Sequence, residues 1–170
     1  IPDFRSAERS FQLLTQVAGR AGRGKIPGLV IIQSFLPDHY VFKFVKEHDF
    51  NSFSEKELAL REKLKYPPFT RMVAMEIESD YETAGEELAH KIQQIITRIL
   101  KGTKGVEVIG PTRSALYQIN NRFRRHLILR SHDYRQLHSV LGKLYETAEI
   151  KSLSNSKIKL TLDIDPINLM

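Results

Sequence analysis

Apolar residues between positions 71 and 164 switch repeatedly between two spacings, one typical of strands and one typical of helices. Alternation with period two indicates a half-buried strand, and a period near 3.6 indicates an amphipathic helix. Strand spacing covers residues 71–78, 106–109, 123–130 and 157–164, and helix spacing covers residues 81–101 and 134–147. The resulting order, β-α-β-β-α-β, predicts an α+β domain of the ferredoxin-like, split-βαβ kind.

The first 50 residues follow another pattern. Helical spacing begins at Ser6 and should end near residues 19–22, because each glycine costs about 1 kcal/mol relative to alanine inside a helix. Residues 29–35 form a short apolar run that predicts a buried strand, and a second helix should begin at Pro37. We expect this strand to belong to a larger parallel sheet. Without its neighbours it would expose an apolar edge, and we expect the segment to be mobile, to pack abnormally or to drive self-association.

Pro67 and Pro68 separate the two regions, since proline lacks a backbone donor and restricts the residue before it. Residues 51–66 before them have helical spacing, with Ser52 and Ser54 each followed three residues later by glutamate. We therefore divide the chain into residues 1–50, a helical connector at 51–66, and an α+β domain at 67–170. The connector would either transmit motion between its neighbours or simply hold the domain in place.

Composition excludes several classes of protein. The chain has no cysteine, which excludes disulfides and thiolate metal sites, and its histidines lack metal-ligand spacing, so we predict no metal site here. No apolar run approaches the roughly 18 residues of a membrane helix. Lys and Arg number 26 against 20 Asp and Glu, a net charge of +6. An anionic partner and a cytoplasmic location fit these features.

The run from Gln16 to Arg23, QVAGRAGR, concentrates polar groups on one side of the chain. If helical geometry continues, steps of about 100° keep Gln16, Arg20 and Arg23 within about 80° of one another. Guanidinium is planar and permanently charged, which suits it to phosphates and to the charge that develops during phosphoryl transfer. A simpler interpretation is a helix C-terminus whose arginines meet the last carbonyls and whose glycines cap it.

This run and residues 3–15 before it resemble the motif VI region of superfamily 2 helicases. More narrowly, they resemble the bacterial primosomal replication-restart helicases, and the resemblance continues through residues 27–33, 57–61 and 66–69. Further matches lie at residues 108–111 and 163–166. The resemblance implies that residues 1–50 end the second RecA-like helicase lobe. It also implies that Arg20 or Arg23 acts as an arginine finger, with Gln16 in the interlobe network.

The resemblance further implies an ATP-dependent 3′–5′ DNA helicase that recognises branched DNA and restarts stalled replication forks by primosome assembly. ATP and Mg²⁺ would be bound mainly by a lobe upstream of this chain, and zinc by an upstream insertion. Primosome proteins and single-strand-binding protein would be its partners. In this family the C-terminal domain is implicated in binding branched DNA.

We expect a polar loop after Pro111, with a turn at residues 120–121. The loop and the strand that follows it, residues 113–130, are the candidate DNA surface, because residues 111–131 contain no acidic side chain. Arginines neutralise phosphates and aromatic rings stack on bases. The candidate DNA-binding residues are Arg113, Tyr117, Arg122, Arg124 and Arg125. Alternatively, Arg122 and Arg124 merely alternate outward from a core strand whose charges discourage aggregation.

Two other classes of function stay open. A basic α+β module could bind RNA or the ribosome without any enzymatic role, because this architecture hosts many functions. A small-molecule regulatory domain is a third class, although it would leave Arg20 and Arg23 unexplained.

The chain by itself should neither hydrolyse ATP nor unwind DNA, because it contains no G-x-x-x-x-G-K-[ST] phosphate-binding loop. An ATPase assay with forked DNA and a strand-displacement assay would measure this. Robust activity in protein free of contaminating helicases would contradict the interpretation.

Overall fold

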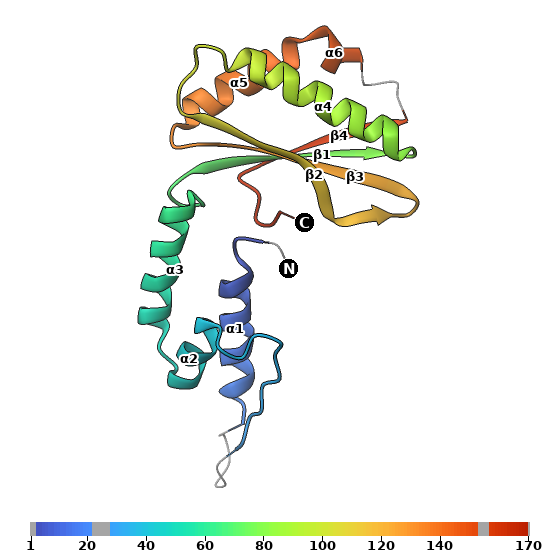
Figure 1. Cartoon of the computed structure of the whole chain (residues 1–170). Helices are drawn as coiled ribbons and strands as arrows, with labels where there is room; N and C mark the ends of the chain where they lie inside the picture. The colour runs from blue at the N-terminus through green and yellow to red at the C-terminus, as the bar shows by residue number, and fades with distance from the viewer. Residues whose placement is uncertain (1–2, 22–27, 153–156, 170) are drawn as a thin grey trace. The chain divides into compact units, whose positions relative to one another are not determined.

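The computed structural model describes residues 3–21, 28–152 and 157–169 (Figure 1). Contacts divide the chain into two compact units, Asp3–Leu64 (unit 1) and Lys65–Met170 (unit 2). Each unit has its own hydrophobic core.

Unit 2 contains a four-stranded sheet in the order β2-β3-β1-β4, in which all neighbouring strands are antiparallel. Its strands are β1 (Arg71–Ser79), β2 (Val106–Ile119), β3 (Arg122–Ser131) and β4 (Ile158–Ile164). Helix α4 (Glu82–Ile99) follows β1, while α5 (Tyr134–Glu146) and the short α6 (Ala148–Lys151) follow β3. The predicted order of strands and helices is confirmed, with α6 added before β4.

The helices of unit 2 lie on one face of the sheet (Figure 1). The core forms between them because alternate residues of each strand point to the same face. Met75 of β1 and Leu127 and Leu129 of β3 are fully buried there. Ile92 and Ile96 of α4 meet them from the helix side. The opposite, helix-free face therefore receives the remaining residues of each strand.

The expected polar loop after Pro111 is wrong, because β2 continues to Ile119. Its pairing with β3 shifts register between Ile109 and Thr112 and again between Arg113 and Gln118. Gly110 lies within the first shift and has a φ of +97°, and a Cβ there would lie 2.7 Å from the His126 carbonyl oxygen. Pairing with β3 keeps this stretch extended although its own side chains do not alternate regularly.

The described part of unit 1 contains three helices, α1 (Ser6–Ala18), α2 (Tyr40–Glu47) and α3 (Phe50–Leu64). Its core holds Phe11, Val41, Val45 and Phe53, and the Phe11 and Phe53 rings stack with centroids 4.2 Å apart. Helix α1 ends before Gly19, as the glycines predict. The predicted connector is helical and its helix packs within unit 1.

A polar network joins α3 to both other helices. Arg61 of α3 lies 3.0 Å from Glu57 on its own helix and 2.8 Å from Glu8 on α1. The Tyr40 hydroxyl of α2 donates to Glu57 at 2.6 Å. Burial would raise the pKa of Glu8, but hydrogen bonds from Arg61 and Arg5 outweigh it and lower that pKa. The network therefore favours the charged forms of Glu8 and Arg61.

The predicted strand at residues 29–35 is wrong. Residues 28–34 have no regular secondary structure, and the side chains of Leu29, Ile31 and Phe35 are exposed. A strand needs a neighbour to accept its backbone hydrogen bonds. The described part of unit 1 contains only helices as regular elements, so the apolar run has nothing to pair with.

Replacing Phe53 with alanine should remove about 3–5 kcal/mol of stability, since the buried ring fills the centre of a small core. Phe50→Ala is the matched control, because the Phe50 ring is 60% exposed and its loss should cost less than about 1 kcal/mol. Amide hydrogen exchange over α1–α3 measures both. Equal protection in the two variants would contradict this account of the core.

Candidate nucleic-acid interface

Strands β2 and β3 form a hairpin that closes at Asn120 and Asn121. These two residues have φ values of 49° and 60°, and the flanking Ile119 and Arg122 pair directly. Positive φ at both central residues is the signature of a type I′ turn, whose twist matches that of antiparallel strands. The predicted turn at these asparagines is confirmed.

Three predicted site residues lie together beside the first turn of α4. The Cζ atoms of Arg113 and Arg125 lie 4.6 and 5.0 Å from the centre of the Tyr117 ring. Both guanidiniums also donate to Oε1 of Glu82, at 3.2 and 3.3 Å. A cation is attracted to the negative face of an aromatic ring. These contacts fasten the hairpin to α4.

Within this group only Arg113 is well exposed. Its side chain is 67% accessible, whereas that of Arg125 is 5% accessible. Arg125 lies on the helix-covered face with Leu127 and also donates to Glu86 of α4 at 3.0 Å. A ligand approaching from solvent would meet Arg113 first.

Arg122 and Arg124 lie on the helix-free face, as the alternative interpretation of this strand predicts. Arg122 donates to Asp80 at 3.1 Å and to Glu78 at 3.5 Å. Arg124 forms an ion pair with Glu76. In both antiparallel pairs the arginine reaches a carboxylate two residues diagonally along the neighbouring strand, a spacing within reach of long side chains.

Sequence reasoning missed the partners of these arginines. Residues 111–131 lack acids, but β1, α4 and the turn between them supply carboxylates from 31 to 48 positions earlier in the chain. The available signal was the alternation in β1, where Glu76 and Glu78 sit between buried Met75, Ile77 and Ser79. An adjacent strand with outward arginines would place the opposite charges side by side.

His126 lies on the same face of β3, opposite Glu76. Burial lowers the pKa of His126, an effect that the Glu76 carboxylate only partly offsets. The ring is therefore neutral near pH 7, as expected for a packed histidine. Among residues 3–21, 28–152 and 157–169, no cluster of three or more His, Cys, Asp or Glu side chains could hold a metal. That same part of the chain holds no helix long and apolar enough to span a membrane.

Gln16 and Arg20 lie at the C-terminal end of α1, and both are exposed. The N–H groups of Gly19 and Arg20 donate to the carbonyls of Thr15 and Val17, so the chain keeps turning past the last helical residue. Gln16 and Arg20, four residues apart, thus stay about one turn apart. Arg23 lies outside the described residues.

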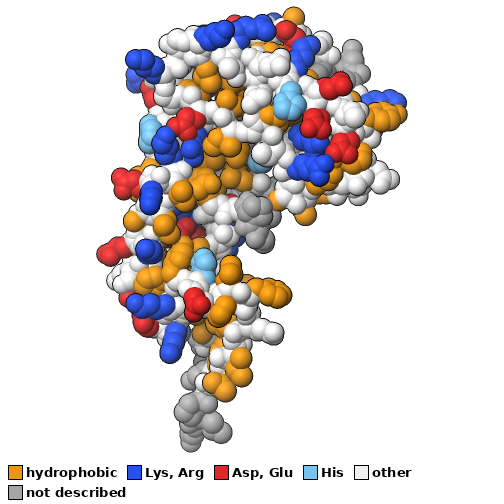
Figure 2. Space-filling view, in the orientation of Figure 1, with side chains coloured by type: hydrophobic (Ala, Val, Ile, Leu, Met, Phe, Trp, Pro, Cys, Tyr) orange, Lys and Arg blue, Asp and Glu red, His pale blue; other side chains and the backbone are white. Residues whose placement is uncertain are grey.

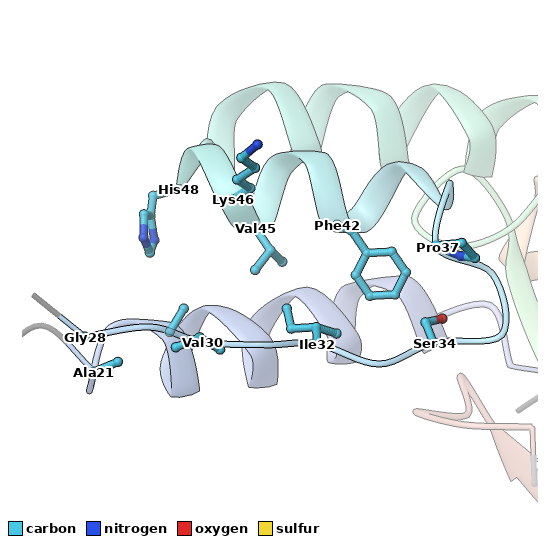
Figure 3. A pocket seen from close by; sticks show the side chains of 11 residues that line it. Ala21, Gly28, Val30, Ile32, Ser34, Pro37, Phe42, Val45, Lys46 and His48 are labelled. Atoms are coloured by element: carbon cyan, nitrogen blue, oxygen red, sulfur yellow. The ribbon is translucent and has the colours of Figure 1, made fainter.

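A hollow of about 580 Å³ lies between residues 28–34 and α2. Figure 3 shows Val30 and Ile32 pointing into it from one side, and Phe42 and Val45 from the other. Most of the lining is apolar. Such a surface lacks the several converging donors that hold a phosphate group. The hollow is therefore not a continuation of the candidate phosphate-binding end of α1.

Fold and charge together define unit 2 as a basic α+β domain, and comparison with known proteins gives its family. The family model described as "Primosomal protein N C-terminal domain" matches residues 62–167, and the chain belongs to that family. It is 34% identical to the replication restart protein PriA of Bacillus subtilis (strain 168), over 100% of this chain and 21% of the relative.

A second relative is the replication restart protein PriA of Synechocystis sp., 36% identical over 98% of this chain and 19% of that protein. The chain thus spans about a fifth of the length of these curated relatives. Among solved structures, the de novo designed protein Foldit4 covers 55% of this chain with a TM-score of 0.40 and 22% identity.

Replacing Arg125 with methionine should cost about 1–3 kcal/mol, because a buried guanidinium loses its carboxylates and its aromatic contact. Arg113→Met is the matched control. Its exposed ion pair to the same Glu82 should contribute less than about 1 kcal/mol. Amide hydrogen exchange over β1–β4 reports both. A greater loss of protection in the Arg113 variant would contradict the assigned roles.

Proposed function

We propose that this chain is part of an ATP-dependent replication-restart helicase, supplying motif VI arginines from unit 1 and a DNA-structure-binding domain from unit 2. The observation that carries the proposal is the match of residues 62–167 to the primosomal protein N C-terminal domain. Identity to proteins named for replication restart along the whole chain supports it. In this proposal the full-length protein restarts stalled forks and unwinds DNA in the 3′–5′ direction.

Arg20 is suited to the arginine-finger role because its side chain is exposed, and among the described residues it has no acidic partner. With Arg23, it would donate to phosphate oxygens of an ATP bound by another lobe, stabilising charge as the terminal phosphoryl group leaves. Gln16, one turn earlier, would join the polar network around those oxygens. Mg²⁺ and zinc would be held by residues outside this chain.

Contacts between α1 and α3 would couple the motion of these two helices within unit 1. Arg61 binds Glu8 of α1, and Phe53 of α3 stacks on Phe11 of α1. A displacement of α1 would therefore move α3 with it rather than bend a free linker. We propose that nucleotide-dependent motion of α1 reaches the end of α3 through these contacts.

In unit 2, Arg113 is the proposed DNA contact with the most accessible charge, and Tyr117 holds it in place through the cation–π contact. Arg122 is partly exposed and would contribute at the helix-free face. Arg124 and Arg125 are mostly covered, so their proposed contribution to DNA binding depends on release from their carboxylate partners. Branched DNA, primosome proteins and single-strand-binding protein are the proposed partners of a cytoplasmic protein.

Fluorescence anisotropy of the chain with a fork, a plain duplex and a single strand across a salt series tests the DNA-binding role. We expect tighter binding to the fork at each salt concentration, because a domain that recognises DNA structure must distinguish geometry as well as charge. Arg113→Gln should weaken binding and reduce the salt slope by about 1. Lys56→Gln, an exposed change in α3, is the charge-matched control.

Equal, steeply salt-dependent binding to all three DNAs would contradict structure recognition and leave a basic surface only. Preference for an RNA hairpin over every DNA would favour the RNA- or ribosome-binding module instead. Absence of binding would remove the DNA-binding role from unit 2.

A further inference from the structure

Two groups of cations in unit 2 differ in their partners. The arginines of β2 and β3 described above have carboxylate partners. A second group lies at the end of the helical layer and has no such partner among the described residues. This helix-end cluster consists of Arg98, Lys101, Lys104 and Arg135.

The cluster is continuous although its members come from two segments. Arg98 is in the last turn of α4, and Lys101 and Lys104 lie in the loop that follows it. A Cβ on Gly105 would lie 2.7 Å from Oε1 of Gln136, so this loop passes directly beside the first turn of α5. Arg135 precedes Gln136 in that turn. Figure 2 shows Lys and Arg side chains along the helical edge of unit 2 at the top of the view, with acidic side chains among them.

Acidic groups near the cluster are already engaged. Residues 98–106 contain none. Oδ1 of Asp133 accepts the backbone N–H of Arg135 at 2.8 Å, as the N-cap of α5. Glu107 binds Lys65 and Arg130. Among the described residues, none of these carboxylates forms an ion pair with a side chain of the cluster.

Capping of α4 explains only part of this arrangement. A cation in the last turn of a helix interacts favourably with the helix dipole, and Arg98 is placed for that. The effect fades within one turn, so it does not account for Lys104. It also disfavours Arg135, which lies in the first turn of α5, where a cation opposes the dipole. A cation at this unfavourable helix end is consistent with a surface that binds an anionic partner.

We propose that the helix-end cluster contacts the phosphate backbone of DNA, as a second contact surface separate from the β2–β3 hairpin. This inference rests on the proposed DNA-binding function of unit 2. Unpaired cations neutralise phosphates and release condensed counterions, which gives them a large, salt-dependent share of affinity. Arginines that already hold carboxylates gain less from the same encounter.

Strand β2 separates the two surfaces. It begins at Val106, beside the cluster, and ends at Ile119, beside the hairpin turn. Its 14 residues would span up to about 45 Å if fully extended. A DNA segment held at the hairpin must therefore extend along the domain, or present a second arm, to reach the cluster.

The test compares two charge-matched variants of the whole chain by fluorescence anisotropy with forked DNA across a salt series. The first is R98Q/K101Q/K104Q/R135Q. The control, K56Q/K63Q/K143Q/K151Q, removes the same charge from exposed side chains elsewhere. We expect the cluster variant to bind at least tenfold more weakly at 100 mM salt and its salt slope to fall by about 3–4. The control should keep the parent slope within about 1.

Both variants should melt within a few degrees of the parent, because none of the changed side chains has a structural partner in the described residues. Parent-like affinity and slope in the cluster variant would overturn the inference while leaving the DNA-binding proposal intact. Equal losses in both variants would mean that only total charge matters, and would also overturn it. If the parent chain itself bound no DNA at 50 mM salt, both proposals would fail together.

Discussion

Antiparallel pairing of β1 with β3 sets Glu78 opposite Arg124 and Glu76 opposite His126, on the face that no helix of unit 2 covers. The register lets Arg122 and Arg124 on that face reach Glu78 and Glu76 of β1. A slip of one residue would send these charges into the core and the apolar residues of both strands outward. The same register points Arg125 toward α4, where Glu82 and Glu86 meet it. Core packing and charge pairing thus depend on one alignment.

Unit 1 is stabilised by a different combination of interactions. Its apolar core is small, and a polar network around Arg61 supplements it by linking α1 to α3 and, through Glu57, to α2. Removing one partner from such a network leaves another charge poorly solvated, so the network favours one arrangement of the three helices. This makes α3 part of the body that carries Gln16 and Arg20, which is a requirement for any coupling between that helix end and the rest of the chain.

Sequence alone predicted most of the fold of unit 2, because periods of two and of 3.6 are local and many of its core residues follow them. It also located the turn at Asn120 and the end of α1 at Gly19. It failed for residues 29–35, where a strand-like composition lacks a pairing partner. It also missed the long β2, whose extension depends on β3. Sequence alone also missed that the arginines of the candidate site are paired with carboxylates, since Glu76, Glu78 and Glu82 reach the site only through the folded topology.

The paired arginines of β2 and β3 turn any approach of DNA to that surface into an exchange. Each guanidinium already has a carboxylate where a phosphate oxygen would sit, so a phosphate must displace Glu76, Glu78 or Glu82 rather than fill an empty place. Displaced carboxylates then face the incoming backbone and repel it. If DNA binds there as proposed, the protein's own acids would compete with phosphates for the arginines and would sharpen selectivity at the expense of affinity.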